Sequence, residues 1–172
     1  EGEYCVTITG LDGCTLEECY KIDVVVLPLS FSGTSTSTSC NGSIDGSADI
    51  RITGGSAPYV ISFADGIRLS TTNGMISRDN LPAGALNFII TDATNTTLAG
   101  SVLVEQPAAI TASSVTVVHD ADATGCTGEI SLELTGGTPG YSVFWNSPNT
   151  GQHIIGLCEG NYVATVRDAT GC

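Results

Sequence analysis

Apolar and polar residues alternate along most of the chain, which is the pattern of β-strands that bury one face. In residues 48–53, Ala48, Ile50 and Ile52 fall on one face of an extended strand, and polar residues fall on the other. Residues 130–135 repeat this alternation. Side chains two residues apart return to the same face of a strand. The pattern therefore predicts a half-buried strand in both places.

Helical periodicity is almost absent from the sequence. The only helix-like run, residues 15–20, is short and has no clear end signal. Elsewhere β-branched residues are abundant, and Gly, Pro, Asn and Asp interrupt the alternating segments at short intervals. Short strands separated by turn residues are typical of antiparallel sandwiches. We therefore expect an all-β protein that consists of tandem Ig-like antiparallel β-sandwiches.

Several segments recur at a spacing of about eighty residues, which is the size of a small Ig-like sandwich. Residues 53–59 resemble residues 135–141, and Asp-Ala-Thr occurs at 92–94 and again at 168–170. One repeat position is occupied by Cys14, Thr96 and Cys172. The chain is thus expected to contain parts of three repeats.

The repeat gives the expected domain boundaries. Residues 1–27 are expected to be the C-terminal strands of a preceding repeat, 28–107 a complete Ig-like repeat, and 108–172 an Ig-like repeat that lacks its last strand. Pro28 and Pro107 fall near the two junctions, where a residue without a backbone N–H does not disturb a strand ladder. Both ends of the sequence fall in strand-like stretches, so we expect a window of a longer polypeptide.

A glycine-rich turn connects two strands of each repeat. Gly54-Gly55 and Gly136-Gly137 both stand shortly before a tyrosine that begins the next strand. Glycine permits positive φ, and a proline in the same turn fixes its geometry. We expect Phe63 and Trp145, at equivalent places in the next strands, to pack between the sheets. A later Asp-x-x-Gly motif, at 168–171, predicts a tight hairpin turn.

Together these motifs resemble the SprB-type repeat of Bacteroidota cell-surface proteins, a family named for a gliding-motility adhesin. The last repeat of the chain carries the family pattern in Cys126-Thr127-Gly128, Gly136-Gly137, Tyr141, Trp145, 156–162 and 168–172. The middle repeat carries it in Cys40-Asn41-Gly42, Gly54-Gly55, Pro58-Tyr59, 81–84 and Asp92, with Pro82 and Thr96 in place of two later cysteines.

The resemblance implies a large secreted tandem-repeat protein of the bacterial cell surface, exported by the type IX secretion system. Its expected function is structural or adhesive, in a gliding-type adhesin or an extracellular filament. The resemblance implies no catalytic activity, so we expect that the chain is not an enzyme. Two alternatives are a carbohydrate-binding module and spacer repeats of a larger secreted enzyme.

Charge limits the classes of partner. The 172 residues include 5 basic and 18 acidic side chains, which gives a formal net charge of −13. Such a charge repels nucleic acid and anionic membrane surfaces. No apolar run approaches the roughly 18 residues of a membrane span. We therefore expect neighbouring repeats of the same chain as partners, and surface glycans or other copies of the protein as further candidates, but neither nucleic acid nor membrane insertion.

The seven cysteines indicate an oxidising, extracellular location. A hairpin centred on Asp12 places Cys5 opposite Cys19, close enough for a disulfide across the two strands. The other face of this hairpin, with Tyr4 and Ile8, is expected to lie against a core.

The remaining cysteines suggest two further disulfides. In an Ig-like unit, Cys126 and Cys158 precede strands that run parallel in facing sheets, so both lie at the same end. A disulfide from Cys40 to Cys172 would cross the junction between repeats and stiffen the array, and Cys14 would then bond to a segment outside this sequence. The alternative is that Cys14, Cys40 and Cys172 are all free or bonded to missing segments.

Motifs for catalysis, phosphate binding and zinc binding are absent from the sequence. We therefore expect no catalytic residues, metal or other cofactor. Calcium prefers oxygen ligands, and its candidate ligands are Asp45, Asp120 and Asp122. Neither the segment around Asp45 nor the pair Asp120 and Asp122 has the spacing of an EF-hand. We therefore favour the interpretation that these carboxylates are surface charges that aid solubility.

Overall fold

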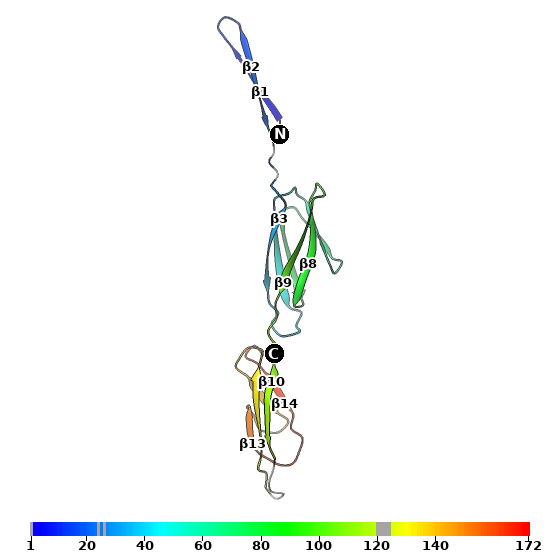
Figure 1. Cartoon of the computed structure of the whole chain (residues 1–172), viewed down its shortest axis with the longest axis vertical. Coiled ribbons are helices and arrows are strands. Elements are labelled where there is room, and N and C mark those ends of the chain that lie inside the picture. Colours follow the sequence, from blue (N-terminus) through cyan, green and yellow to red (C-terminus); the bar gives the residue numbers. More distant parts are fainter. Residues whose placement is uncertain (1, 24, 26, 120–124) are drawn as a thin grey trace.

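The structure is a computed structural model that describes residues 2–23, 25, 27–119 and 125–172. Within these ranges it contains fourteen strands and no helix. Every strand pair is antiparallel, which confirms the prediction of an all-β antiparallel fold, and residues 15–20 belong to a strand. Figure 1 shows three bodies in succession along the long axis: an N-terminal hairpin, a second unit and a third unit.

The N-terminal hairpin consists of β1 (Gly2–Thr9) and β2 (Thr15–Ile22). Its register pairs Cys5 with Cys19 and Thr9 with Thr15, which confirms the hairpin centred on Asp12. The two strands form a sheet of their own. In the described part of the chain, β1 and β2 therefore pair only with each other.

The second unit is a sandwich of two antiparallel sheets. Its strands are β3 (Ser30–Thr36), β4 (Gly46–Thr53), β5 (Tyr59–Phe63), β6 (Arg68–Thr71), β7 (Met75–Leu81), β8 (Gly84–Thr91) and β9 (Thr97–Val104). One sheet has the order β3-β4-β7 and the other the order β6-β5-β8-β9. The core between them includes Ile50 of the first sheet and Ile61, Ile90 and Val104 of the second, each at most 1 % exposed.

The third unit repeats this plan with fewer strands. Its strands are β10 (Thr111–Val118), β11 (Gly128–Thr135), β12 (Ser142–Trp145), β13 (His153–Leu157) and β14 (Ala164–Arg167). The sheet β10-β11-β13 corresponds to β3-β4-β7, and the sheet β12-β14 corresponds to β5-β8. Val143, Ile154 and Leu157 are its buried apolar residues. In the described part of the chain no strand corresponds to β6 or β9 of the second unit.

One apolar face of the hairpin is exposed in the described part of the chain, and its expected packing against a core stays a prediction. That face includes Tyr4, Val6 and Ile8, which are 58 %, 56 % and 59 % exposed. The alternation correctly gives the side chains that share a face, but no described strand packs on that face. Burial needs a second layer, and a two-stranded hairpin cannot supply one by itself.

The structure also changes the alignment of the cysteines between the repeats. Gly46 pairs with Leu81 at the start of β4, and Gly128 pairs with Leu157 at the start of β11. Gly46 and Gly128 are therefore equivalent. Cys126 lies two residues before Gly128 and therefore corresponds to Ile44, two residues before Gly46. The Cys-x-Gly motif, which aligned Cys126 with Cys40 in the sequence, thus does not mark equivalent positions in the two units.

The buried centre of the second unit makes a direct stability prediction. Ile61 is fully buried, so the Ile61→Ala variant should lower the free energy of unfolding of this unit by about 2–5 kcal/mol. Ile89 on β8 is 49 % exposed, so Ile89→Ala should cost well under half as much. Urea unfolding followed by circular dichroism measures both variants. Equal effects of the two substitutions would contradict the assignment of the core.

Candidate functional site

A buried carboxylate fixes the turn between β8 and β9. Asp92 is only 5 % exposed. Its Oδ1 accepts hydrogen bonds from the N–H groups of Thr94 and Thr96, both at 2.9 Å, and from the Thr94 hydroxyl at 2.7 Å. Its Oδ2 accepts the N–H of Ser56 at 3.0 Å, from the turn after β4. One side chain thus joins two turns at the same end of the sandwich.

Asp168 makes the same set of contacts in the third unit. Its Oδ1 accepts hydrogen bonds from Thr170 and from the N–H of Cys172, and its Oδ2 accepts the N–H of Thr138 at 2.9 Å. The Thr138 N–H makes the largest contribution to a lowered pKa, followed by Thr170, so the pKa of Asp168 falls to about 2. The pKa of Asp92 is lowered as well, mainly by the Thr94 hydroxyl.

The glycine pair in each unit holds the segment that enters that unit. All four glycines have positive φ, which confirms the predicted turn: Gly54 and Gly55 at 69° and 61°, Gly136 and Gly137 at 81° and 57°. The N–H of Gly55 donates to the carbonyl of Leu27, and the N–H of Gly137 donates to the carbonyl of Ala108, at 2.7 and 2.8 Å. The entering strand is therefore fixed beside the aspartate-bound turn.

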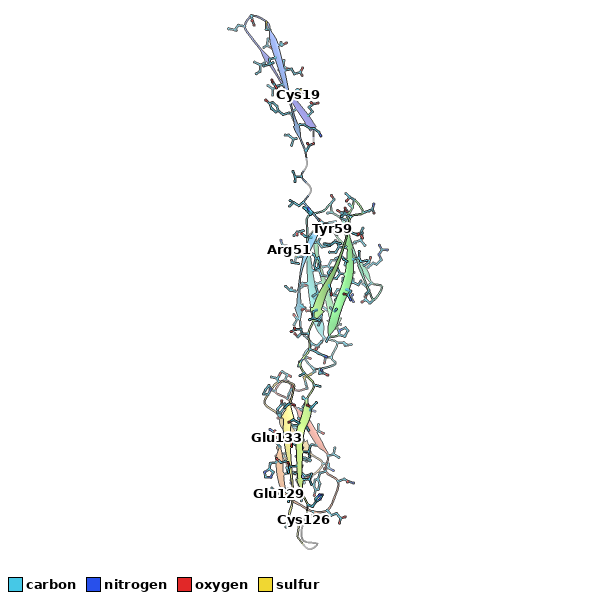
Figure 2. The ribbon with its side chains drawn as sticks, viewed as in Figure 1. Cys19, Arg51, Tyr59, Cys126, Glu129 and Glu133 are labelled. Atoms are coloured by element: carbon cyan, nitrogen blue, oxygen red, sulfur yellow. A yellow bond between two sulfur atoms is a disulfide. The ribbon has the colours of Figure 1, made fainter. Side chains whose placement is uncertain are left out.

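The tyrosine after each glycine pair completes this arrangement. The Tyr59 hydroxyl donates to the carbonyl of Gly54 at 2.7 Å, and the Tyr141 hydroxyl donates to the carbonyl of Gly136. Tyr59 is 9 % exposed, and Figure 2 shows it near the end of the second unit that faces the hairpin. The Tyr59 ring therefore packs inside the sandwich, whereas Tyr141 is half-buried.

The junction between the second and third units is covalent. A disulfide joins Cys40, in the loop after β3, to Cys172, in the turn that Asp168 organises. Two hydrogen bonds join the same loop to the linker, which is the segment between β9 and β10. Asn41 Nδ2 donates to the carbonyl of Pro107 at 3.0 Å, and the Gly42 N–H donates to Gln106 Oε1 at 2.9 Å. The loop after β3 therefore contacts both the linker and the next unit.

Asp45 belongs to this same loop. Its Oδ1 accepts the N–H of Ser39 at 3.0 Å, and hydrogen bonding from Ser39 lowers its pKa. The carboxylate thus closes the loop around Cys40. A calcium ion at Asp45 stays a prediction, and the other two candidates, Asp120 and Asp122, lie outside the described residues.

Two further disulfides lie within single bodies. Cys5–Cys19 crosses the hairpin, and Cys126–Cys158 joins the residues just before β11 and just after β13. Because β11 and β13 are antiparallel neighbours, the second bridge lies within one sheet and does not connect facing sheets as expected. Figure 2 shows Cys126 at the end of the third unit farthest from the second. Cys14 is exposed and carries no disulfide.

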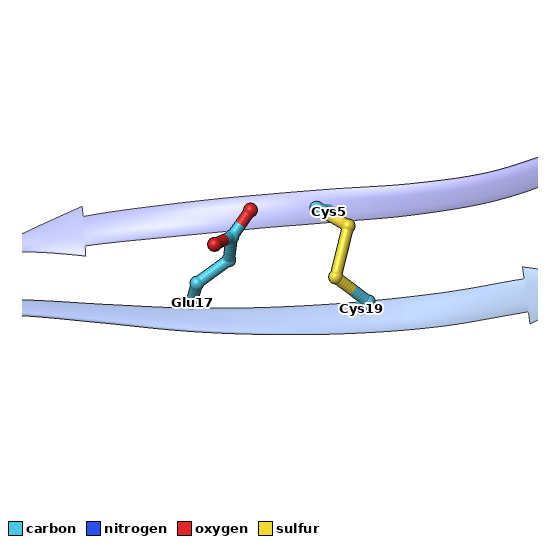
Figure 3. A group of neighbouring side chains, drawn as sticks. All are labelled: Cys5, Glu17 and Cys19. Atoms are coloured by element: carbon cyan, nitrogen blue, oxygen red, sulfur yellow. A yellow bond between two sulfur atoms is a disulfide. The ribbon is translucent and has the colours of Figure 1, made fainter.

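In the described ranges, one group of side chains has the composition of a metal site: Cys5, Glu17 and Cys19 (Figure 3). Both sulfur atoms belong to the disulfide, so neither is available as a thiolate ligand. The hairpin also exposes all three residues. The group is therefore an exposed disulfide beside an acidic side chain.

The two residues expected between the sheets differ in burial. Phe63 is 4 % exposed and packs edge-on against Phe88, with ring centroids 5.9 Å apart. Trp145 is half-buried and its Nε1 donates to the carbonyl of Gly151 at 3.0 Å. Both side chains lie on the inner face of their sheets, but the core around Trp145 is less complete.

Comparison with known protein families gives one match, which lies in the second unit. Residues 32–66, from β3 to the turn after β5, match the family model described as the SprB repeat. This segment of the second unit is therefore similar to the SprB repeat. Curated proteins give no match to the chain. None of the described segments forms a helix long and apolar enough to cross a membrane.

The glycine turns can be tested by a matched pair of substitutions. Gly136 and Gly151 both have positive φ, at 81° and 94°. A methyl group at Gly136 would overlap the carbonyl of Ala109, whereas one at Gly151 would meet no atom within 4 Å. Gly151→Ala should lower the free energy of unfolding by about 1–2 kcal/mol, because alanine disfavours the left-handed conformation. Gly136→Ala should lower it by about 1–3 kcal/mol more, because of the overlap. Fluorescence of Trp145, the sole tryptophan, measures unfolding of this unit.

Acid should destabilise the third unit through Asp168. Its folded-state pKa, about 2, lies below the ordinary value of 3.8, so its stabilising effect is present above about pH 4 and is lost as the pH falls towards 2. Thermal unfolding followed by Trp145 fluorescence measures this loss. Asp168→Asn should be less stable at pH 7 and should lose less stability between pH 4 and 2. Parallel acid profiles of the two proteins would contradict the assignment.

Proposed function

We propose that the chain is a load-bearing segment of a secreted bacterial tandem-repeat protein at the cell surface, which acts in adhesion or in an extracellular filament. The SprB-type repeat supports the cell-surface location, and three disulfides are consistent with an oxidising environment. In this proposal the export route is type IX secretion and the nearest partners are neighbouring repeats.

The observation that carries the proposal is the path that tension would take through the chain. A force applied at the two ends reaches Cys40 and then passes through its disulfide directly to Cys172, 132 positions later in the sequence. Residues 41–171 lie in the loop that this bond closes, so they bear no load. The Cys5–Cys19 disulfide similarly removes most of the hairpin from the path.

Unfolding of the residues in the two closed loops would therefore not lengthen the covalent path between the two ends. Within the second unit the load path includes β3 but excludes β4 to β9. The covalent path runs through residues 1–5 and 19–40 and two disulfides, which allows a length of roughly 100 Å at about 3.3–3.6 Å per residue. A fully reduced chain of 172 residues would extend to roughly 600 Å. Resistance to extension is a property expected of a tether or filament.

Single-molecule stretching between the two ends tests the proposal. The oxidised chain should stop at roughly 100 Å, and Cys40→Ser combined with Cys172→Ser should extend several-fold further. Cys126→Ser combined with Cys158→Ser is the matched control, because that bridge lies inside the bypassed loop and its loss should leave the length unchanged. If the oxidised wild type extended as far as the reduced chain, the load-bearing function would be refuted.

Adhesion requires a separate measurement, because the load path concerns only the segment between two attachment points. Beads coated with the oxidised chain should stay bound to a surface under flow longer than beads coated with the Cys40→Ser, Cys172→Ser variant, if a binding partner is present at both ends. Binding of the isolated chain to a glycan array would favour the carbohydrate-binding alternative instead.

A further inference from the structure

One face of the N-terminal hairpin carries three residues whose side chains can bind a metal ion. The register of β1 and β2 places Cys5 directly opposite Cys19, with Cα atoms 4.0 Å apart. Glu17 precedes Cys19 by two residues on β2, so its side chain lies on the same face of the hairpin. The two sulfur atoms and a carboxylate oxygen of Glu17 lie within 4.8 Å of one another (Figure 3). The strand register assembles this group, so no Cys-x-x-Cys spacing marks it in the sequence.

The equivalent face of a complete sandwich is open to solvent. A pair of threonines closes the turn in both the β1–β2 and the β8–β9 hairpin, Thr9 with Thr15 and Thr91 with Thr97. Counted from these pairs, the group corresponds to Asn87, Ala99 and Ser101 of the second unit. All three are exposed, although β8 and β9 belong to a sandwich of two sheets. Access to the group therefore does not depend on what packs against the apolar face of the hairpin.

The fold of the hairpin does not require these three residues. The second unit forms the same hairpin with an amide, a methyl group and a hydroxyl at the three positions. The Glu17 carboxylate also forms no ion pair or hydrogen bond with another described residue, and the nearby Lys21 pairs with Asp23 at 2.8 Å. The carboxylate beside the two sulfur atoms is thus available to a cation.

The redox state of the cysteines decides whether the group can bind a metal. In the oxidised chain both sulfur atoms are used in the disulfide. A dithiol reductant transfers two electrons and two protons to this bond, which leaves two cysteine thiols and a cyclic disulfide of the reductant. Each thiol then releases its proton to solvent when it binds a metal. Two thiolates on a tetrahedral zinc ion lie roughly 3.7 Å apart, at Zn–S distances of about 2.3 Å. Rotation of the side chains reaches this separation without a change of strand register.

We propose that reduction of the Cys5–Cys19 disulfide converts this group into a Zn²⁺ site, with Cys5 and Cys19 as thiolate ligands and Glu17 as a carboxylate ligand. One position of the tetrahedron stays open to solvent. Thiolates favour zinc over calcium and magnesium, which prefer oxygen ligands. The bound ion holds β1 and β2 in the register that the disulfide holds in the oxidised chain, so the hairpin is cross-linked in both redox states.

Protection of the thiols by zinc tests the site on the intact, reduced chain. The chain is alkylated with iodoacetamide in the presence and absence of Zn²⁺, and mass spectrometry measures the rate at each cysteine. Zinc should slow alkylation of Cys5 and Cys19 about tenfold or more. Cys14 is the internal control, because it is an exposed thiol on the same hairpin but outside the group, and its rate should not change. Equal protection of Cys14, or no protection of Cys5 and Cys19, would overturn the proposal.

A second measurement assigns the ligands. It uses the 172-residue chain with serine at the other five cysteines, so that Cys5 and Cys19 are the only thiols. The reduced chain should bind one Co²⁺ ion, a spectroscopic substitute for Zn²⁺, with a thiolate-to-metal charge-transfer absorption that Zn²⁺ abolishes. The oxidised chain should show no such absorption. Circular dichroism verifies that the chain and its variants fold.

Two neighbouring glutamates provide a matched pair of variants in this chain. Glu17→Gln removes the carboxylate ligand and should weaken metal binding about tenfold. Glu18→Gln should leave the affinity unchanged, because Glu18 pairs with Val6 on the opposite face of the hairpin. Equal affinities of the two variants, or metal binding by the oxidised chain, would overturn the proposed site.

Discussion

The architecture depends on the hydrogen bonds of one buried carboxylate in the second unit and one in the third. Asp92 and Asp168 each accept four hydrogen bonds, which join the last hairpin of a unit to the turn that receives the entering strand. A buried carboxylate is stable only when such donors surround it, so each turn must adopt one conformation. That conformation places residue 172 where its sulfur can reach the unit before it.

The covalent junction follows from this local order. Cys172 lies on a turn held by Asp168, and Cys40 lies in a loop closed by Asp45 and by the buried hydroxyl of Thr38, which donates to the carbonyl of Cys40. The disulfide between these two ordered loops lets tension bypass the third unit and strands β4 to β9 of the second unit. The mechanical property proposed for the chain therefore arises from side chains that organise turns, and the β-sheets themselves bear little load.

The three bodies differ mainly in how many strands cover each apolar face. The second unit has both sheets, and the faces that enclose Ile61 and Ile90 are dry. The third unit leaves Val115 uncovered, and the hairpin leaves Tyr4 uncovered. The same alternation thus produces a buried core in the second unit and exposed apolar side chains in the other two bodies. A strand of the right pattern can be buried only where a second layer supplies the partner surface.

The sequence by itself determined the elements that depend on neighbouring residues. Alternation located the strands around Ile50 and Leu132, the glycine pairs located the turns with positive φ, and symmetry about Asp12 set the hairpin register. Only the tertiary structure decided which faces are buried, that Gly46 rather than Gly42 is equivalent to Gly128, and that the carboxylates of Asp92 and Asp168 hold two turns together. The physical reason is that these properties depend on contacts between strands distant in sequence, which local periodicity does not specify.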